Sequence, residues 1–178
     1  WSNVYATNFT GEASKAATLR VGSDFRSASS SSSNNTVAVR DATGNIAANL
    51  FQGVATQARY ADLAEKYSTA KDLAPGTVVC VSISTEYEVE PVRIGSTAIG
   101  VVSTNPAVMM NSEADGQYIG LKGRLPVKIV GEVNKGDKVY VNNAGCASTE
   151  INGGSLVGIA LESNSDEGEK LVECVLKV

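Results

Sequence analysis

The chain has 178 residues, a formal net charge of −4 and no histidine. The lack of histidine excludes Ser-His-Asp and Cys-His catalytic systems and histidine-ligated metal sites, and the acidic balance argues against nucleic-acid binding, which needs a basic surface. Hydrophobic residues make up 43% of the chain but aromatic residues only 6%, so we expect a core of Val, Ile, Leu and Ala and, without an apolar run of about 20 residues, no membrane insertion.

Two copies of one sequence pattern lie in the first third of the chain. Residues 3–16 and 45–58 share the pattern Asn-[Val/Ile]-x-Ala-x-x-Phe-x-Gly-x-Ala-x-x-Ala, with an offset of 42 residues. Each copy carries one large apolar anchor, Phe9 in the first and Phe51 in the second. Self-similarity at a fixed spacing is typical of repeat and fibre architectures.

Each copy has too little apolar surface for this region to form a stable core by itself. Ordering the backbone costs about 1–2 kcal/mol per residue, and the Ser-rich tract 27–36 offers no core-forming side chain. We therefore expect residues 1–57 to form an extended repetitive shaft that buries Phe9 and Phe51 against further repeats or identical chains. Within it, a short strand and turn are predicted over residues 37–45.

The connector at residues 58–74 is ambiguous in secondary structure. Tyr60, Leu63, Ala64 and Tyr67 follow the i, i+3, i+4, i+7 spacing of a helix. Leu63 and Tyr67, together with Ala61, also share one face of a strand. Periodicity leaves both alternatives open.

The remainder, residues 75–178, is a succession of short β-branched runs separated by turn signals. About eight strands at such spacing, without a clear amphipathic helix among them, predict a compact antiparallel β-barrel or β-sandwich. The expected strands cover residues 77–83, 87–92, 97–102, 118–121, 125–130, 138–141, 156–161 and 171–176.

The sequence predicts no catalytic, cofactor-binding or metal-binding residue. Glu86, Glu88 and Glu90 alternate, which predicts a solvated face of one strand. The three cysteines, at irregular spacing and among apolar or small neighbours, are interpreted as small buried hydrophobic residues. No constellation meets the geometric requirements of an active site.

Two long polar turns are the candidates for contact with a receptor, because loops disproportionately carry binding function. The first lies at residues 111–116 and the second at residues 162–169. The candidate receptor-facing residues are Asn111, Glu113, Asp115, Asn164 and Asp166.

Two stretches of the chain carry a resemblance to a known family. Asn-Ile-Ala-Ala-Asn-Leu-Phe-Gln-Gly at 45–53, Ala-Arg-Tyr-Ala-Asp-Leu-Ala-Glu-Lys-Tyr at 58–67 and Pro-Gly-Thr-Val-Val at 75–79 form the first. The second is Ile-Gly-Val-Val-Ser-Thr-Asn-Pro-Ala-Val-Met at 99–109. Together they resemble tail-fibre and neck-appendage proteins of tailed bacteriophages, in which a repetitive shaft joins a β domain. The resemblance covers about residues 36–178.

The resemblance implies an intertwined homotrimer that forms part of the virion, as a tail fibre or appendage assembled in the host cytoplasm. Its expected partners are other virion tail or neck proteins and a host surface glycan or protein, with no nucleic acid. Trimerisation agrees with the separate argument that the shaft cannot bury enough surface alone. The expected function is structural, in attachment to the bacterial host, and not enzymatic.

Two alternatives remain open at this point. Some relatives cleave themselves near an Asp or Glu and release a C-terminal chaperone, so the β domain could be an autoproteolytic assembly domain. The other alternative is a capsid or whisker decoration module without a receptor role. No catalytic residue is transferred from the family to this chain.

Overall fold

The computed structural model describes residues 18–21, 24–29, 36–46, 48 and 61–178. The chain divides into two compact units, Trp1–Ala55 and Thr56–Val178. The predicted shaft anchors Phe9 and Phe51 lie outside the described residues, as does nearly all of both repeat copies.

The first unit contains a small three-stranded sheet. Its strands are β1 (Thr18–Val21), β2 (Asp24–Ser29) and β3 (Thr36–Ala38), in the order β1-β2-β3. β1 and β2 pair antiparallel, whereas β2 and β3 pair parallel. A turn follows, in which one Asp41 carboxylate oxygen accepts hydrogen bonds from the amides of Thr43 and Asn45 at 2.9 and 2.8 Å. Strand and turn therefore occur where the sequence predicts them.

The second unit is built from strands, and the described residues contain no helix. Its strands form a single ten-stranded arrangement. They are β4 (Asp62–Tyr67), β5 (Val78–Val81), β6 (Val89–Pro91), β7 (Ala98–Val102), β8 (Val108–Met110), β9 (Gln117–Ile129), β10 (Lys138–Val141), β11 (Ala147–Ser148), β12 (Leu156–Ala160) and β13 (Lys170–Leu176). In the described part of the chain no helix is long and apolar enough to cross a membrane.

Part of this arrangement closes into a small barrel. β9 pairs with β13, β13 with β12, β12 with β10 and β10 with β11, all antiparallel. β11 then returns to β9 through a parallel contact of Ala147 with Ile129. Closure leaves no free edge in this ring of strands. The prediction of a mainly β fold with a barrel or sandwich is confirmed, as a barrel.

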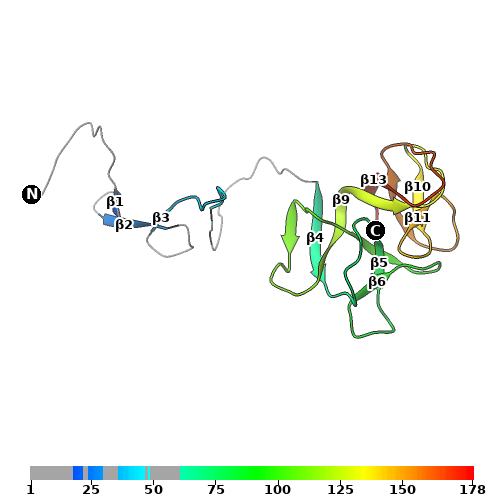
Figure 1. Cartoon of the computed structure of the whole chain (residues 1–178), viewed down its shortest axis with the longest axis horizontal. Coiled ribbons are helices and arrows are strands. Elements are labelled where there is room, and N and C mark those ends of the chain that lie inside the picture. Colours follow the sequence, from blue (N-terminus) through cyan, green and yellow to red (C-terminus); the bar gives the residue numbers. More distant parts are fainter. Residues whose placement is uncertain (1–17, 22–23, 30–35, 47, 49–60) are drawn as a thin grey trace, which may run out of the picture. The chain divides into compact units, whose positions relative to one another are not determined.

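The long strand β9 belongs to both halves of the second unit. Its first residues pair with β4 and β7, and its last residues, from Arg124 to Ile129, pair with β13. Beyond β9, the order continues as β7-β5-β6 on one side, and β4 carries β8 on the other. In Figure 1, β9 runs from the side of β4 into the barrel. Residues from distant parts of the sequence therefore meet along β9.

The core of the second unit is dominated by valine, as the low aromatic content predicts. One cluster fills the barrel and the adjoining β5 and β7, and a smaller cluster lies under the other face of β5 and β7. Fully buried side chains include Val78, Val79, Val101, Ile119, Val127, Ile129, Val139, Val141, Val157 and Val172. β-branched side chains suit a pleated surface that is buried.

Three differences from the predicted strands have local causes. The ambiguous stretch becomes strand β4, because it adds to the edge of β9 in antiparallel register. The predicted strands at 118–121 and 125–130 are one strand, since Gly123, with φ of +114°, lets the backbone continue through Lys-Gly-Arg. β8 and β11 have only three and two residues, too few for a pattern in the sequence.

Candidate functional site

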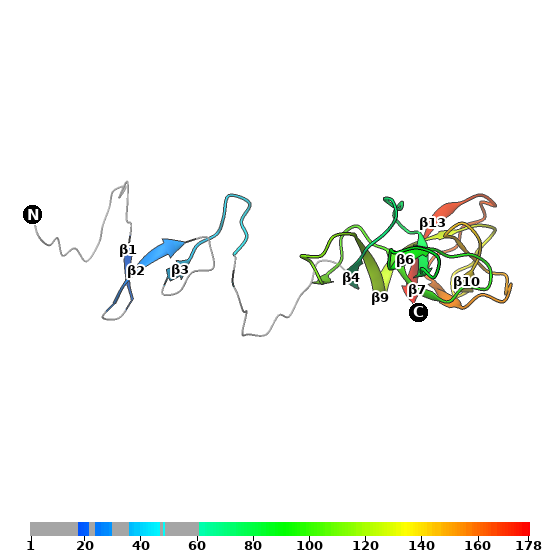
Figure 2. The same ribbon diagram turned by 90° about the horizontal axis from the view of Figure 1, so that it is seen from below.

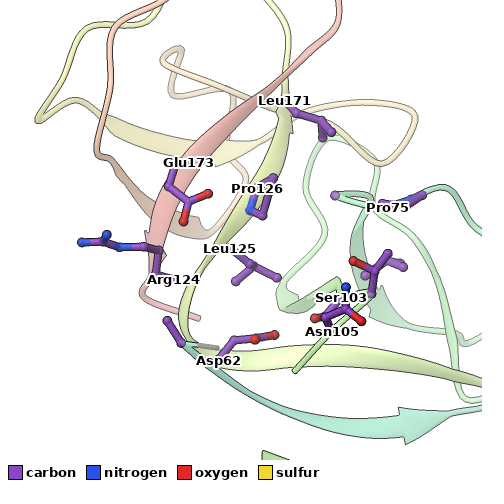
Figure 3. A pocket seen from close by; sticks show the side chains of 13 residues that line it. Asp62, Pro75, Ser103, Asn105, Arg124, Leu125, Pro126, Leu171 and Glu173 are labelled. Atoms are coloured by element: carbon purple, nitrogen blue, oxygen red, sulfur yellow. The ribbon is translucent and has the colours of Figure 1, made fainter. Parts of the chain in front are cut away.

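A cavity of about 520 Å³ lies where β4, β9 and β13 approach the loop after β7. Its polar wall comes from the start of β4, from β13 and from the loop at residues 103–105, while prolines and leucines supply the apolar wall (Figure 3). The residues that line it are Ala61, Asp62, Pro75, Gly76, Val102, Ser103, Thr104, Asn105, Arg124, Leu125, Pro126, Leu171 and Glu173.

Backbone hydrogen bonds hold the walls of the cavity in place. The Ala107 amide donates to the carbonyl of Asp62 at 2.8 Å, which ties the loop after β7 to β4. The Arg124 amide donates to the carbonyl of Ala61 at 3.1 Å, so β4 is also fixed to β9. Gly76 donates to Val102 and accepts from Lys128. The cavity is thus framed by ordered backbone from four segments.

Asp62 is the most unusual residue of the site. Only 5% of it is exposed, and its Oδ2 atom has no hydrogen-bond partner among the described residues. Buried carboxylates normally pair with a cation or accept several hydrogen bonds, because removing the charge from water is unfavourable. In Figure 3 the Asp62 carboxylate points toward the interior of the site, below Leu125.

Glu173 approaches the same cavity from β13, where it lies opposite Pro126 of β9. Burial raises the pKa of Glu173 above its usual value, the positive charge of Arg124 opposes the rise, and the charges of Glu162 and Asp62 add to it. The Arg124 guanidinium extends away from Asp62 (Figure 3). The positive charge of Arg124 therefore offsets the negative charge of Glu173 more than that of Asp62.

This arrangement is suited to binding a polar ligand. Two carboxylates and one guanidinium give the site an excess of negative charge, and the loop at residues 103–105 adds neutral hydroxyl and amide groups. Within the described part of the chain, no three His, Cys, Asp or Glu side chains gather closely enough to hold a metal ion. A concave, mostly apolar pocket with a few convergent polar groups is the usual form of a small-molecule site.

The residues predicted to face a receptor do not line this cavity. Asn111, Glu113 and Asp115 lie on the exposed turn between β8 and β9. Asp166 is exposed on the loop between β12 and β13, and Asn164 on the same loop is half-buried through its bridge to Val133. The two loops lie at opposite ends of the second unit in Figures 1 and 2. Their role in receptor binding stays a prediction.

Sequence reasoning missed Asp62, Arg124 and Glu173, because 62 and 111 positions separate the first from the other two. One signal was present. Asp62 shares a strand face with Ala64, and both are buried in β4. A charged residue on the buried face of an otherwise apolar strand often marks a functional position.

The alternating glutamates are placed differently from the prediction. Only Glu90 belongs to a strand, β6, where it pairs with Arg93 at 2.5 Å. Glu86 and Glu88 lie in the exposed connection between β5 and β6. The prediction of one strand face for all three is wrong, because the hairpin opens into a long turn, and the Ser68 amide binds Glu88 from outside the hairpin at 2.7 Å.

The interpretation of the cysteines as buried hydrophobic residues is confirmed. Cys80, Cys146 and Cys174 are all buried and none forms a disulfide. Burial, together with a hydrogen bond to Glu169, raises the pKa of Cys146 to about 11, and burial raises the pKa of Cys174 to about 12. Both thiols are therefore protonated and weakly nucleophilic near neutral pH.

The second unit is a small closed β-barrel with an attached sheet, and its fold is similar to solved structures of a bacteriophage protein. No protein-family model matches the chain, and no curated protein sequence matches it. The structure of the pre-mature bacteriophage phi29 gene product 12 is similar at a TM-score of 0.54 and 15% identity, over 75% of this chain and 23% of that one. The C-terminal fragment of the same gene product is similar at a TM-score of 0.50 and 14% identity, over 65% of this chain and 100% of the fragment.

These similarities establish a shared fold. The chain spans about a quarter of the length of pre-mature gene product 12 but the whole of its C-terminal fragment. The second unit is therefore similar to a β domain found in a bacteriophage protein.

Proposed function

We propose that this chain is a module of a bacteriophage virion appendage, a tail fibre or neck appendage that takes part in attachment to the bacterial host. The observation that carries the proposal is the match of this fold to the entire C-terminal fragment of phi29 gene product 12. The resemblance of residues 45–53, 58–67, 75–79 and 99–109 to phage fibre proteins supports the same function independently. A shared fold alone does not imply a shared function, so the proposal rests on the fold and on the sequence resemblance together.

We propose further that the chain acts as a homotrimer held together by the shaft at residues 1–57. The support is energetic, since each repeat copy has a single aromatic anchor and cannot offset its ordering entropy alone. Light scattering at micromolar concentration tests this. A mass of three times 18.4 kDa is expected, and a monomeric mass contradicts the proposal.

Attachment is tested on the virion and on the host. An antibody against the second unit is expected to label the tail or neck of intact virions in electron micrographs, and the purified chain is expected to compete with virions for adsorption to host cells. Labelling without competition favours a decoration module, and no labelling at all contradicts the proposal.

A second candidate is an autoproteolytic assembly domain. It is favoured by one observation, that a structural neighbour is a pre-mature form and another is a C-terminal fragment of the same protein. Expression of the whole gene tests it by intact-mass spectrometry. A single cleavage that is abolished by one carboxylate-to-amide substitution favours self-cleavage, whereas an uncleaved product contradicts it.

A further inference from the structure

The unpartnered carboxylate of Asp62 indicates that the cavity holds a ligand with a strong hydrogen-bond donor. A buried charge that lacks a partner destabilises the folded protein. A ligand that supplies the missing donor recovers this energy on binding. The terminal torsion of an aspartate is soft, so a small rotation presents an Asp62 oxygen to the cavity while the backbone stays fixed by Ala107.

The charge balance of the cavity favours a donor that is itself a cation. Asp62 and Glu173 contribute two negative charges against the one positive charge of Arg124. Arg124 acts on Glu173, whose pKa it lowers against the effect of burial, and its side chain extends away from Asp62 (Figure 3). Asp62 is therefore the carboxylate left for an ammonium group, and charge-assisted hydrogen bonds are the stronger kind.

The rest of the lining indicates what carries the ammonium group. Ser103, Thr104 and Asn105 place neutral hydroxyl and amide groups along one wall, where they suit ligand hydroxyls. Pro126 and the half-exposed Leu171 present apolar surface on the opposite side. A lone lysine side chain would leave most of the 520 Å³ empty, whereas a sugar ring offers both hydroxyl groups and an apolar C–H face.

We propose that this cavity binds an amino sugar with a free amine, with Asp62 as the partner of the ammonium group. The inference rests on the proposed attachment function and names the glycan class that the second unit would take from the host surface. The neutral wall at residues 103–105 orients the ring hydroxyls, and the apolar wall packs against the ring. The cavity volume lies in the 300–1,000 Å³ range typical of ligand sites.

Calorimetric titration with two trisaccharides tests the proposal. One is the β-1,4-linked glucosamine trimer, and the other is its N-acetylated form, which has the same ring but no positive charge. We expect the amine form to bind the full-length protein at least tenfold more tightly. In nuclear magnetic resonance spectra, shifts are expected at Ser103, Asn105 and Glu173.

Three variants separate the cavity from the rest of the surface. Asp62→Asn is expected to weaken binding of the amine form at least tenfold, whereas the same substitution at Asp72, which is exposed and does not line the cavity, leaves it unchanged. Leu171→Trp, which narrows the mouth without touching Asp62, is expected to weaken binding as well. If Asp62→Asn does not fold, Leu171→Trp carries the test alone.

The outcomes distinguish this inference from the proposed function. Equal affinity for both trisaccharides, binding of neither, or binding unchanged by the cavity variants overturns the amino-sugar site. If virion adsorption is still blocked by the purified chain in that case, attachment stands and uses another surface. Loss of both trisaccharide binding and competition for adsorption overturns the two together.

Discussion

At the scale of single residues, the unpartnered carboxylate of Asp62, which we propose binds a ligand, lowers the stability of the ligand-free protein. A carboxylate that is 95% buried and has an unpartnered oxygen is unfavourable in the free protein. We therefore expect Asp62→Asn to stabilise the free chain by about 1 kcal/mol, or ~3 °C in Tm, because it removes the buried charge while keeping the shape. Differential scanning calorimetry measures this, with Asp115→Asn as the exposed control. A lower Tm for Asp62→Asn than for the control contradicts the prediction.

The buried cysteines give a second residue-scale prediction, on pH dependence. With a pKa of about 11, Cys146 is almost entirely protonated at pH 8, and only the thiolate reacts with alkylating reagents. Its labelling rate in the native protein is expected to be ~100-fold below that in urea, and to rise about tenfold per pH unit from pH 8 to 10. Peptide mass spectrometry after timed alkylation follows each cysteine. A native rate equal to the rate in urea contradicts the burial of Cys146.

At the scale of elements, the junction of β4 with β9 depends on one glycine. Gly123 has φ of +114°, and a methyl group there would lie 2.1 Å from the carbonyl oxygen of Ala61. That carbonyl accepts the amide of Arg124, so an added side chain separates the strands that frame the cavity.

We therefore expect Gly123→Ala to lower the free energy of unfolding by at least ~3 kcal/mol. Gly136→Ala is the matched control, because Gly136 has φ of +96° but open space where the methyl group would lie. Only backbone strain, about 1 kcal/mol, is expected there. Urea midpoints of the two variants measure the difference, and equal midpoints contradict a packing role for Gly123.

The strands of the second unit differ in how well the sequence predicts them. β5, β7, β10, β12 and β13 fall within β-branched runs that the sequence marks plainly, because a buried strand needs such runs. The secondary structure of β4 is ambiguous in the sequence because its burial depends on pairing with residues of β9 that lie at least 50 positions away. The cavity was not predictable for the same reason. Asp62, Arg124 and Glu173 acquire their relation only when β9 joins β4 and β13, and no local pattern encodes that.

At the scale of the whole molecule, the two units differ in what they need for folding. Among residues 38–46, 48 and 61–178, the buried hydrophobic residues lie between Ala64 and Leu176, within the second unit. The barrel closes on strands of that unit alone. For the repeats in residues 1–57, by contrast, we propose that they bury apolar surface against identical chains. On this proposal, we expect folding of the β unit to be separable from assembly of the chain.

A fragment of residues 56–178 is accordingly expected to fold by itself, with a single cooperative urea transition. By light scattering at micromolar concentration it should have the mass of one copy, because the shaft to which we assign the association has been removed. The full-length chain at the same concentration is the control, with the expected mass of three copies. A fragment that stays trimeric would place the association in the β unit and contradict assembly through the shaft. A fragment that fails to fold would contradict the independence of the β unit, since its barrel and core would then require residues 1–55.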